Sequence, residues 1–205
     1  MDVTLIAPGH LRVLVADATG HGVQAALRTM VIKTAYDGIK LFATKPSECL
    51  TALNLALVEA YPDLEAKTDA ACVDVLLEEG GAMRVRVSTA GAMTALIGDG
   101  DARVSEMHVP GYPLGVAGWM NFREMESVFT REARVCLFTD GISEQEGPDG
   151  KMYDFDRVEA QIAQIRGPSE TVEGLFAHWR EFRGEGAQDD DASVLVIAAA
   201  VAARL

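Results

Sequence analysis

The chain has 205 residues, of which 49% are hydrophobic and 24% charged, a composition that excludes a disordered or fibrous protein. Its formal net charge of −13 argues against a surface for nucleic acid or anionic membranes, because such a surface would repel phosphates. The sequence contains no apolar run near the ~18 residues of a membrane span and no signal-peptide pattern.

Taken in chain order, the first elements are two predicted strands, at 3–7 and 11–16, joined by a turn. A glycine-containing loop follows, and the apolar spacing then predicts helices at 22–42 and 44–62. Thr44 lies near the start of the second helix, with Pro46 in its first turn.

The pattern changes to short strands between residues 70 and 137, with hairpin-like turns between them. Two helices near 154–166 and 169–183 and a last strand at 193–199 complete the chain. Because hairpins and not βαβ units connect the strands, we expect an α+β fold of antiparallel sheets with helices on their outer faces. The predicted strands of this region are 70–79, 82–90, 93–98, 102–109, 122–130 and 133–139.

Aspartates mark the ends of three apolar strands. Asp17 ends "RVLVAD", Asp140 ends "RVCLFTD", and Asp189, Asp190 and Asp191 precede the last strand. If the last strand runs antiparallel to the other two, these carboxylates meet at one sheet edge. Carboxylates in contact repel unless a cation lies among them, and oxygen ligands suit Mg²⁺ or Mn²⁺. The sequence therefore predicts a divalent-metal site.

Each feature has a simpler explanation when taken alone. Asp140-Gly141 is a common turn, the aspartates at 189–191 could form a solvated loop, and Asp17 could precede a helix capped by Thr19. Cys49, Cys72 and Cys136 lie too far apart for a zinc motif, which favours buried, reduced thiols in a cytoplasmic domain.

The glycine loop also fits the dinucleotide-binding pattern G-x-G-x-x-A, through Gly20, Gly22 and Ala25. That pattern requires a parallel strand ending in an acid about 20 residues later. The acid at that distance is Asp37, which lies inside a predicted helix, so this alternative is disfavoured.

Five blocks occur in an order typical of one protein family. Residues 17–22 match D-x-x-G-H-G, 138–144 match [YF]-T-D-G-[VI]-[ST]-E, 190–193 match D-D-[IM]-[TS], 88–93 resemble N-A-G-H-x-P, and 111–116 resemble P-L-G-[LIV]. Over nearly its whole length the chain resembles the metal-dependent PPM (PP2C-like) protein phosphatases, specifically their bacterial branch named after sporulation stage II protein E (SpoIIE).

The resemblance implies a four-layer αββα sandwich with two mainly antiparallel sheets, and a site for two Mn²⁺ or Mg²⁺ ions. Asp17 would bridge both ions, the Ala18 carbonyl would complete one coordination sphere, and Asp140 and Asp190 would bind from other strands. Asp191 would support these ligands, and Gly141 would leave room for nearby backbone.

Three further positions bear on the resemblance. The family has an acidic block about 17 residues before the glycine-loop aspartate, and Asp2 lies 15 residues ahead of Asp17, which makes it a candidate metal ligand. Ala92 occupies the place of a family histidine. His21 is a candidate general acid, or a residue that orients water.

The resemblance implies a phosphoserine/phosphothreonine protein phosphatase that uses metal-activated water without a phospho-enzyme. Its substrate would be a phosphoprotein such as a STAS-domain anti-sigma-factor antagonist. We expect residues 1–205 to be one domain that lacks its first N-terminal strand. It would be the output domain of a longer regulatory protein that could be anchored in a membrane. Upstream domains or a second subunit of a homodimer would act on the helices at 22–60. The alternative is a phosphatase-like module that has lost turnover and serves in regulatory binding.

Overall fold

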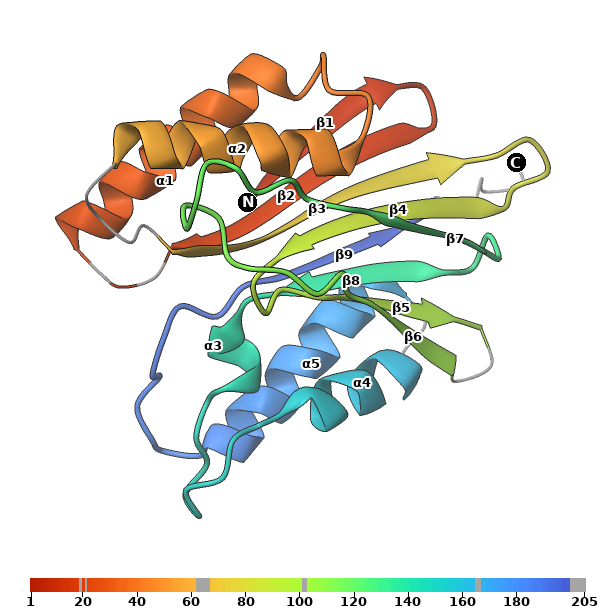
Figure 1. Ribbon diagram of the computed structural model, residues 1–205. Helices are drawn as coiled ribbons and strands as arrows, with labels where there is room; N and C mark the ends of the chain where they lie inside the picture. Colours follow the sequence, from red (N-terminus) through yellow and green to blue (C-terminus); the bar gives the residue numbers. More distant parts are fainter. Residues whose placement is uncertain (19, 21, 62–66, 101–102, 165–166, 200–205) are drawn as a thin grey trace. The chain divides into compact units, whose positions relative to one another are not determined.

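The computed structural model describes residues 1–18, 20, 22–61, 67–100, 103–164 and 167–199 (Figure 1). The chain divides into two compact units whose segments alternate along the sequence. Unit 1 consists of Met1–Gly80, Arg84–Thr94 and Met107–Val128, and unit 2 of Gly81–Met83, Ala95–Glu106 and Phe129–Leu205. Because the segments alternate, neither unit is a continuous stretch that could be cut out.

Unit 1 is built on a five-stranded sheet with the strand order β1-β2-β3-β4-β7. Two helices cover one face of this sheet (Figure 1). The strands are β1 (Asp2–Ala7), β2 (His10–Ala18), β3 (Thr68–Leu77), β4 (Met83–Ala90) and β7 (Met125–Phe129), and the helices are α1 (Val23–Ile39) and α2 (Pro46–Ala60).

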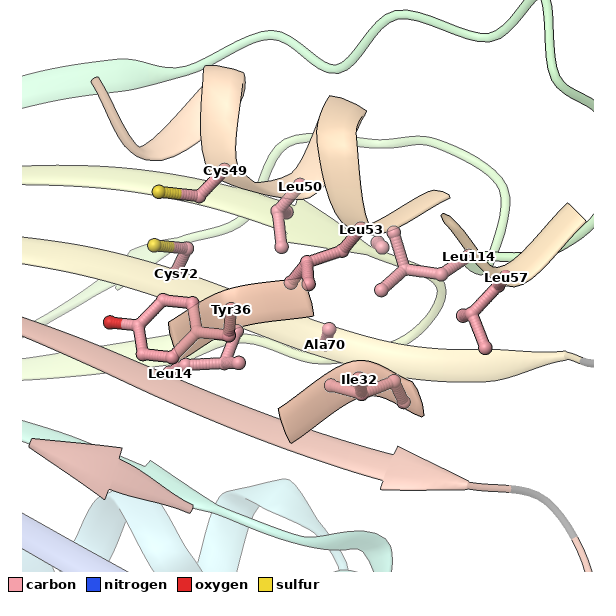
Figure 2. Close-up of a cluster of buried hydrophobic side chains, with 11 residues drawn as sticks. Leu14, Ile32, Tyr36, Cys49, Leu50, Leu53, Leu57, Ala70, Cys72 and Leu114 are labelled. Carbon is pink, nitrogen blue, oxygen red and sulfur yellow. The ribbon is translucent and has the colours of Figure 1, made fainter. Parts of the chain in front are cut away.

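The core of unit 1 lies between this sheet and its two helices. Figure 2 shows Leu14 of β2 and Cys72 of β3 among side chains of α1 and α2, such as Tyr36 and Leu53. Successive strand residues point to opposite faces. Consequently Val13 and Val15 of β2, with Ala71, Val73 and Val75 of β3, face away from the helices, and these are buried too.

Unit 2 is built on a four-stranded sheet with the order β6-β5-β8-β9, in which β8 pairs antiparallel with both neighbours. Its core joins Cys136 and Phe138 of the sheet to Val158, Leu175 and Trp179 of the helices. The elements are β5 (Ala95–Asp99), β6 (Arg103–Met107), β8 (Arg134–Phe138), β9 (Val194–Ala198), α3 (Asp140–Ser143), α4 (Phe155–Gln164) and α5 (Pro168–Arg183).

The predicted helices and strands are confirmed to within about three residues at their ends, and the one-turn helix α3 was not predicted. The α+β class with antiparallel sheets is confirmed as well. The three cysteines, all among the described residues, are buried free thiols. Among the described helices, none is both long and apolar enough to cross a membrane.

Candidate metal centre

Asp17 lies near the end of β2, directly opposite Asp69 of β3 in the antiparallel register. Directly opposite residues of an antiparallel pair project from the same face of the sheet. Both aspartates have odd numbers, so they continue the row of Val15 and Ala71, which faces away from α1 and α2. Val15 and Ala71 are buried, whereas Asp17 and Asp69 are partly exposed. Two carboxylates therefore stand together where an apolar row meets solvent.

Two segments that carry the family resemblance, residues 88–93 and 111–116, form hydrogen bonds with the first residues of β3. The backbone N–H of Ala92 donates to Oδ2 of Asp69 at 3.0 Å. Thr68 and Leu114 exchange backbone hydrogen bonds of 3.1 and 2.9 Å. The "STAGAM" and "GYPLGV" segments are thus fixed beside the residue that pairs with Asp17.

Gly91 is required by this arrangement. Its φ of +69° lies in the left-handed region, and a Cβ there would lie 1.9 Å from Oδ1 of Asp69. Any larger residue at position 91 would displace the Asp69 carboxylate.

The glycine loop after β2 is described only in part. Gly20 and Gly22 have φ values of +92° and +78°, which glycine adopts without strain. Thr19 and His21 lie outside the described residues, so the predicted role of His21 stays a prediction.

Asp2 lies on the other face of the sheet from Asp17. It pairs with Leu14, which packs toward α1 and α2, and its carboxylate lies 3.0 Å from Nζ of Lys33 and 3.6 Å from Nζ of Lys40. Partial burial acts to raise the pKa of Asp2, but hydrogen bonds from Thr4 and Lys33 and the two lysine charges hold it below its ordinary value. The structure therefore does not bring the Asp2 and Asp17 carboxylates together.

In unit 2, Asp140 and Asp190 line one cleft of about 420 Å³. Asp140 follows β8 directly as the first residue of α3, and Asp190 belongs to the segment that leads into β9. Glu144 and Asp189 also line the cleft, which makes it strongly acidic.

Main-chain contacts fix the two walls of the cleft. The Thr139 hydroxyl donates to the Asp191 carbonyl at 3.0 Å and accepts the Ser193 N–H at 3.0 Å. A Cβ at Gly141 would lie 2.6 Å from the Asp191 carbonyl oxygen, so only glycine allows this approach. The Asp191 backbone therefore lies against Gly141, and the supporting roles predicted for Asp191 and Gly141 stay predictions.

Asp189 is used to hold the cleft together. Its Oδ2 accepts hydrogen bonds from Gln145 Nε2 at 2.7 Å and from the Glu146 N–H at 3.1 Å. Asp190 accepts the Asp191 N–H at 2.7 Å through one oxygen. Asp140 and Asp190 thus remain the cleft's candidate ligands, as the sequence predicted.

The donors fit a hard divalent ion, because they are carboxylate and carbonyl oxygens at strand ends. Among the residues that the structure describes, no group of three or more His, Cys, Asp or Glu side chains could hold a metal ion. Of the predicted ligands, Asp17 and Ala18 belong to unit 1, and Asp140 and Asp190 belong to unit 2.

The sequence reasoning did not single out Asp69, which lies opposite Asp17. The predicted strand begins at Ala70, one residue after it, whereas β3 begins at Thr68. Pairing the apolar residues of β2 and β3 by their alternation would have set Asp69 beside Asp17.

Comparison with known proteins adds independent evidence. Residues 7–200 match the family model described as Stage II sporulation protein E (SpoIIE). The phosphoserine phosphatase RsbP of Bacillus subtilis (strain 168) is 24% identical over 190 residues, which cover 90% of this chain and 45% of RsbP. The chain thus spans about half the length of this curated relative.

Solved structures agree in fold. The SiaA-PP2C domain of Pseudomonas aeruginosa has a TM-score of 0.78 at 24% identity, over 94% of this chain and 77% of that one. RsbX in complex with magnesium has a TM-score of 0.66 at 13% identity, over 95% and 83%. The chain therefore belongs to the SpoIIE family, and its fold is that of a PP2C-type phosphatase domain.

Proposed function

We propose that this chain is a metal-dependent phosphoserine/phosphothreonine protein phosphatase. The observation that carries the proposal is that Asp140 and Asp190, far apart in the sequence, line one acidic cleft fixed by Gly141 and Thr139. Family membership, the phosphoserine phosphatase RsbP and the magnesium complex of RsbX support it.

In the proposed site, Asp17, the Ala18 carbonyl, Asp140 and Asp190 would hold two divalent ions, Mn²⁺ or Mg²⁺. When bound, such ions supply activated water and neutralise the phosphoryl oxygens. Gly141 and the Asp191 backbone hold Asp140 and Asp190 in place, and His21 donates a proton to the leaving serine or threonine oxygen. Attack by water on phosphorus requires no phospho-enzyme. Asp2 is left out of this ligand set, since it faces Lys33 and Lys40.

We further propose a phosphoprotein substrate in bacterial signalling, of the STAS-domain anti-sigma-factor antagonist kind, acted on in the cytoplasm. Val23, Leu27 and Met30 form an exposed apolar row on α1, and Phe42, beyond the end of the helix, is exposed as well. This row offers a surface for upstream regulatory domains of a longer protein or for a second subunit.

The alternative is a regulatory binding module without turnover. The position of Asp2 favours this alternative. The family has an acidic residue before the glycine loop, but Asp2 lies near Lys33 on the other face of the sheet and does not place its carboxylate beside Asp17. Turnover measurements separate the two functions.

The test is hydrolysis of a phosphoserine protein and of p-nitrophenyl phosphate with and without Mn²⁺. We expect Mn²⁺-dependent turnover that falls at least ~100-fold in Asp17→Asn and in Asp140→Asn, because each loses a metal-binding carboxylate. Asp156→Asn is the matched control, since Asp156 is exposed on α4, and it should keep full activity. Absence of metal-stimulated turnover in the unmodified protein would overturn the proposal in favour of the binding module.

A further inference from the structure

We propose that Cys49 and Cys72 form a redox-sensitive pair, which hydrogen peroxide converts into a disulfide between α2 and β3. This modification site is independent of phosphatase turnover and goes beyond the proposed function. Two features of unit 1 carry it. The two cysteines come from different elements and meet in the core, and the guanidinium group of Arg12 lies beside one of them.

The two cysteines lie where α2 packs on β3. Cys49 belongs to the first turn of α2, and Cys72 lies in β3, where it pairs with Leu14 of β2. Both side chains are fully buried in the core of unit 1, and Figure 2 shows their sulfur atoms directed to the same side. A hydrogen bond joins the two side chains. The sulfur atoms are therefore within reach of each other, as formation of a disulfide requires.

The surroundings make Cys49 the nucleophile of the pair. Nη1 of Arg12 donates a hydrogen bond to Sγ of Cys49 at 3.4 Å. The hydrogen bond with Cys72 and the charge of Arg12 hold the pKa of Cys49 below its ordinary value, against the effects of burial and of Asp74. Burial keeps the pKa of Cys72 well above its ordinary value, so its thiol stays protonated. Because the thiolate is the form that attacks an oxidant, Cys49 reacts first.

The reaction has two steps that balance with one molecule of hydrogen peroxide. The Cys49 thiolate attacks one peroxide oxygen, so that an S–O bond forms and the O–O bond breaks. The sulfur is oxidised to a sulfenic acid, and the departing hydroxide takes up a proton as water. The Cys72 sulfur then attacks the Cys49 sulfur, and the S–S bond replaces the S–O bond. The second water leaves with the proton of the Cys72 thiol.

Burial restricts the oxidant to a small molecule. Thiol–disulfide exchange needs access for the sulfur of a second molecule, and the fully buried Cys49 and Cys72 offer none in the folded state. Peroxide is little larger than water and needs only a local opening of the core. The competing explanation is that both cysteines serve as small apolar residues and are inert, as buried structural cysteines are.

Cys136 of unit 2 separates the two explanations within the same chain. It is also a buried free thiol, and burial raises its pKa to about 12. A thiol with this pKa stays protonated and is a poor nucleophile. If burial alone decided reactivity, Cys49 and Cys136 would be equally inert. The contact with Arg12 and Cys72 predicts instead that Cys49 reacts much faster.

The experiment treats the folded, fully reduced chain with hydrogen peroxide, alkylates the remaining thiols in denaturant and maps the peptides by mass spectrometry. We expect a Cys49–Cys72 link that dithiothreitol reverses, with Cys136 oxidised at least ~tenfold more slowly than Cys49. Cys136→Ala is the matched control and should form the same link at the same rate. In Cys72→Ala, oxidation should stop at a sulfenic acid on Cys49, which dimedone traps.

Absence of the Cys49–Cys72 link, or equal rates of oxidation for Cys49 and Cys136, would overturn the inference and leave the pair as packing residues. A link that forms only at urea concentrations that unfold the chain would overturn it too. These outcomes are read on the unmodified protein, so they hold even if Cys72→Ala does not fold. Formation of the link in a protein without phosphatase turnover would support the inference and contradict only the proposed function.

Discussion

At the scale of single residues, the side of the sheet from which a carboxylate projects decides what it can bind. Asp17 and Asp69 face away from α1 and α2, whereas Asp2 faces α1, where Lys33 and Lys40 surround it. A difference of one residue in strand position is enough to exchange the two faces. The distance between acids along the sequence is therefore a poor guide to which of them share an ion.

Asp2→Asn tests this separation. We expect Mn²⁺ affinity to stay unchanged, because Asp2 is engaged with lysines on the other face, and stability at neutral pH to fall by at most ~1 kcal/mol. The folded-state pKa of Asp2 lies below its unfolded value, so its contribution to stability is present above the ordinary Asp range and is lost as the pH falls through the folded pKa. Urea unfolding at neutral and acidic pH measures the difference, which should vanish in acid.

A loss of Mn²⁺ affinity in Asp2→Asn comparable to that of Asp17→Asn would contradict this expectation and restore Asp2 as a ligand. Thr4→Val is a control for the local hydrogen bond, because it removes the Thr4 hydroxyl that donates to Asp2 at 2.7 Å without touching the charge.

At the scale of elements, one buried side chain ties the sheet of unit 1 to the end of α1. Arg12 forms a bidentate pair with Asp74 of β3, with N–O distances of 2.6 and 2.7 Å, and both residues are at most 1% exposed. Its Nη1 also donates to the carbonyls of Lys40 and Ala43, which follow α1. Burial acts to lower the pKa of Arg12, but the hydrogen bonds and charge of Asp74 raise it further, so the guanidinium stays charged.

Arg12→Met should lower the free energy of unfolding by ~3–5 kcal/mol, because the buried Asp74 carboxylate loses its guanidinium partner. Arg84→Met is the control: Arg84 pairs with Glu78 and Glu126 at a partly exposed site, and we expect a much smaller loss there. Urea unfolding measures both. The double variant Arg12→Met/Asp74→Leu should regain part of the loss, and an equal cost for Arg12→Met and Arg84→Met would show that the buried pair does not anchor α1.

The buried Arg12–Asp74 pair is an example of an interaction that the sequence alone does not predict. The apolar periods of β2 and β8 predicted the strands and the aspartates at their ends, since alternation and turn residues are local signals. Arg12 and Asp74 interrupt apolar runs without any local sign that they pair across strands. Asp69 was missed because the strand boundary was placed one residue late, and strand boundaries are set by pairing with another segment. Register, which determines the face of Asp2, depends on the same long-range pairing.

At the scale of the whole molecule, the net charge of −13 acts against a substrate that carries a phosphate. The divalent ions of the proposed site would attract the phosphoryl group locally, but they would leave the protein as a whole negative. The approach of a phosphoprotein therefore depends on the charge around its phosphoserine. Salt screens this effect, because the Debye length falls from ~30 Å at 0.01 M to ~8 Å at 0.15 M ionic strength.

Two phosphoserine peptides of equal length, one with acidic and one with basic flanking residues, make this dependence measurable at saturating Mn²⁺. Raising the ionic strength from ~0.01 to ~0.15 M should increase kcat/KM for the acidic peptide and decrease it for the basic one, each by roughly threefold to tenfold. The value of kcat should change little, because screening acts on association between the free partners and much less on the bound complex. A third peptide of the same length with uncharged flanking residues is the control, and its response should lie between the two. If all three peptides respond alike, the charges that line the cleft around Asp140 and Asp190, and not the charge of the whole molecule, govern association.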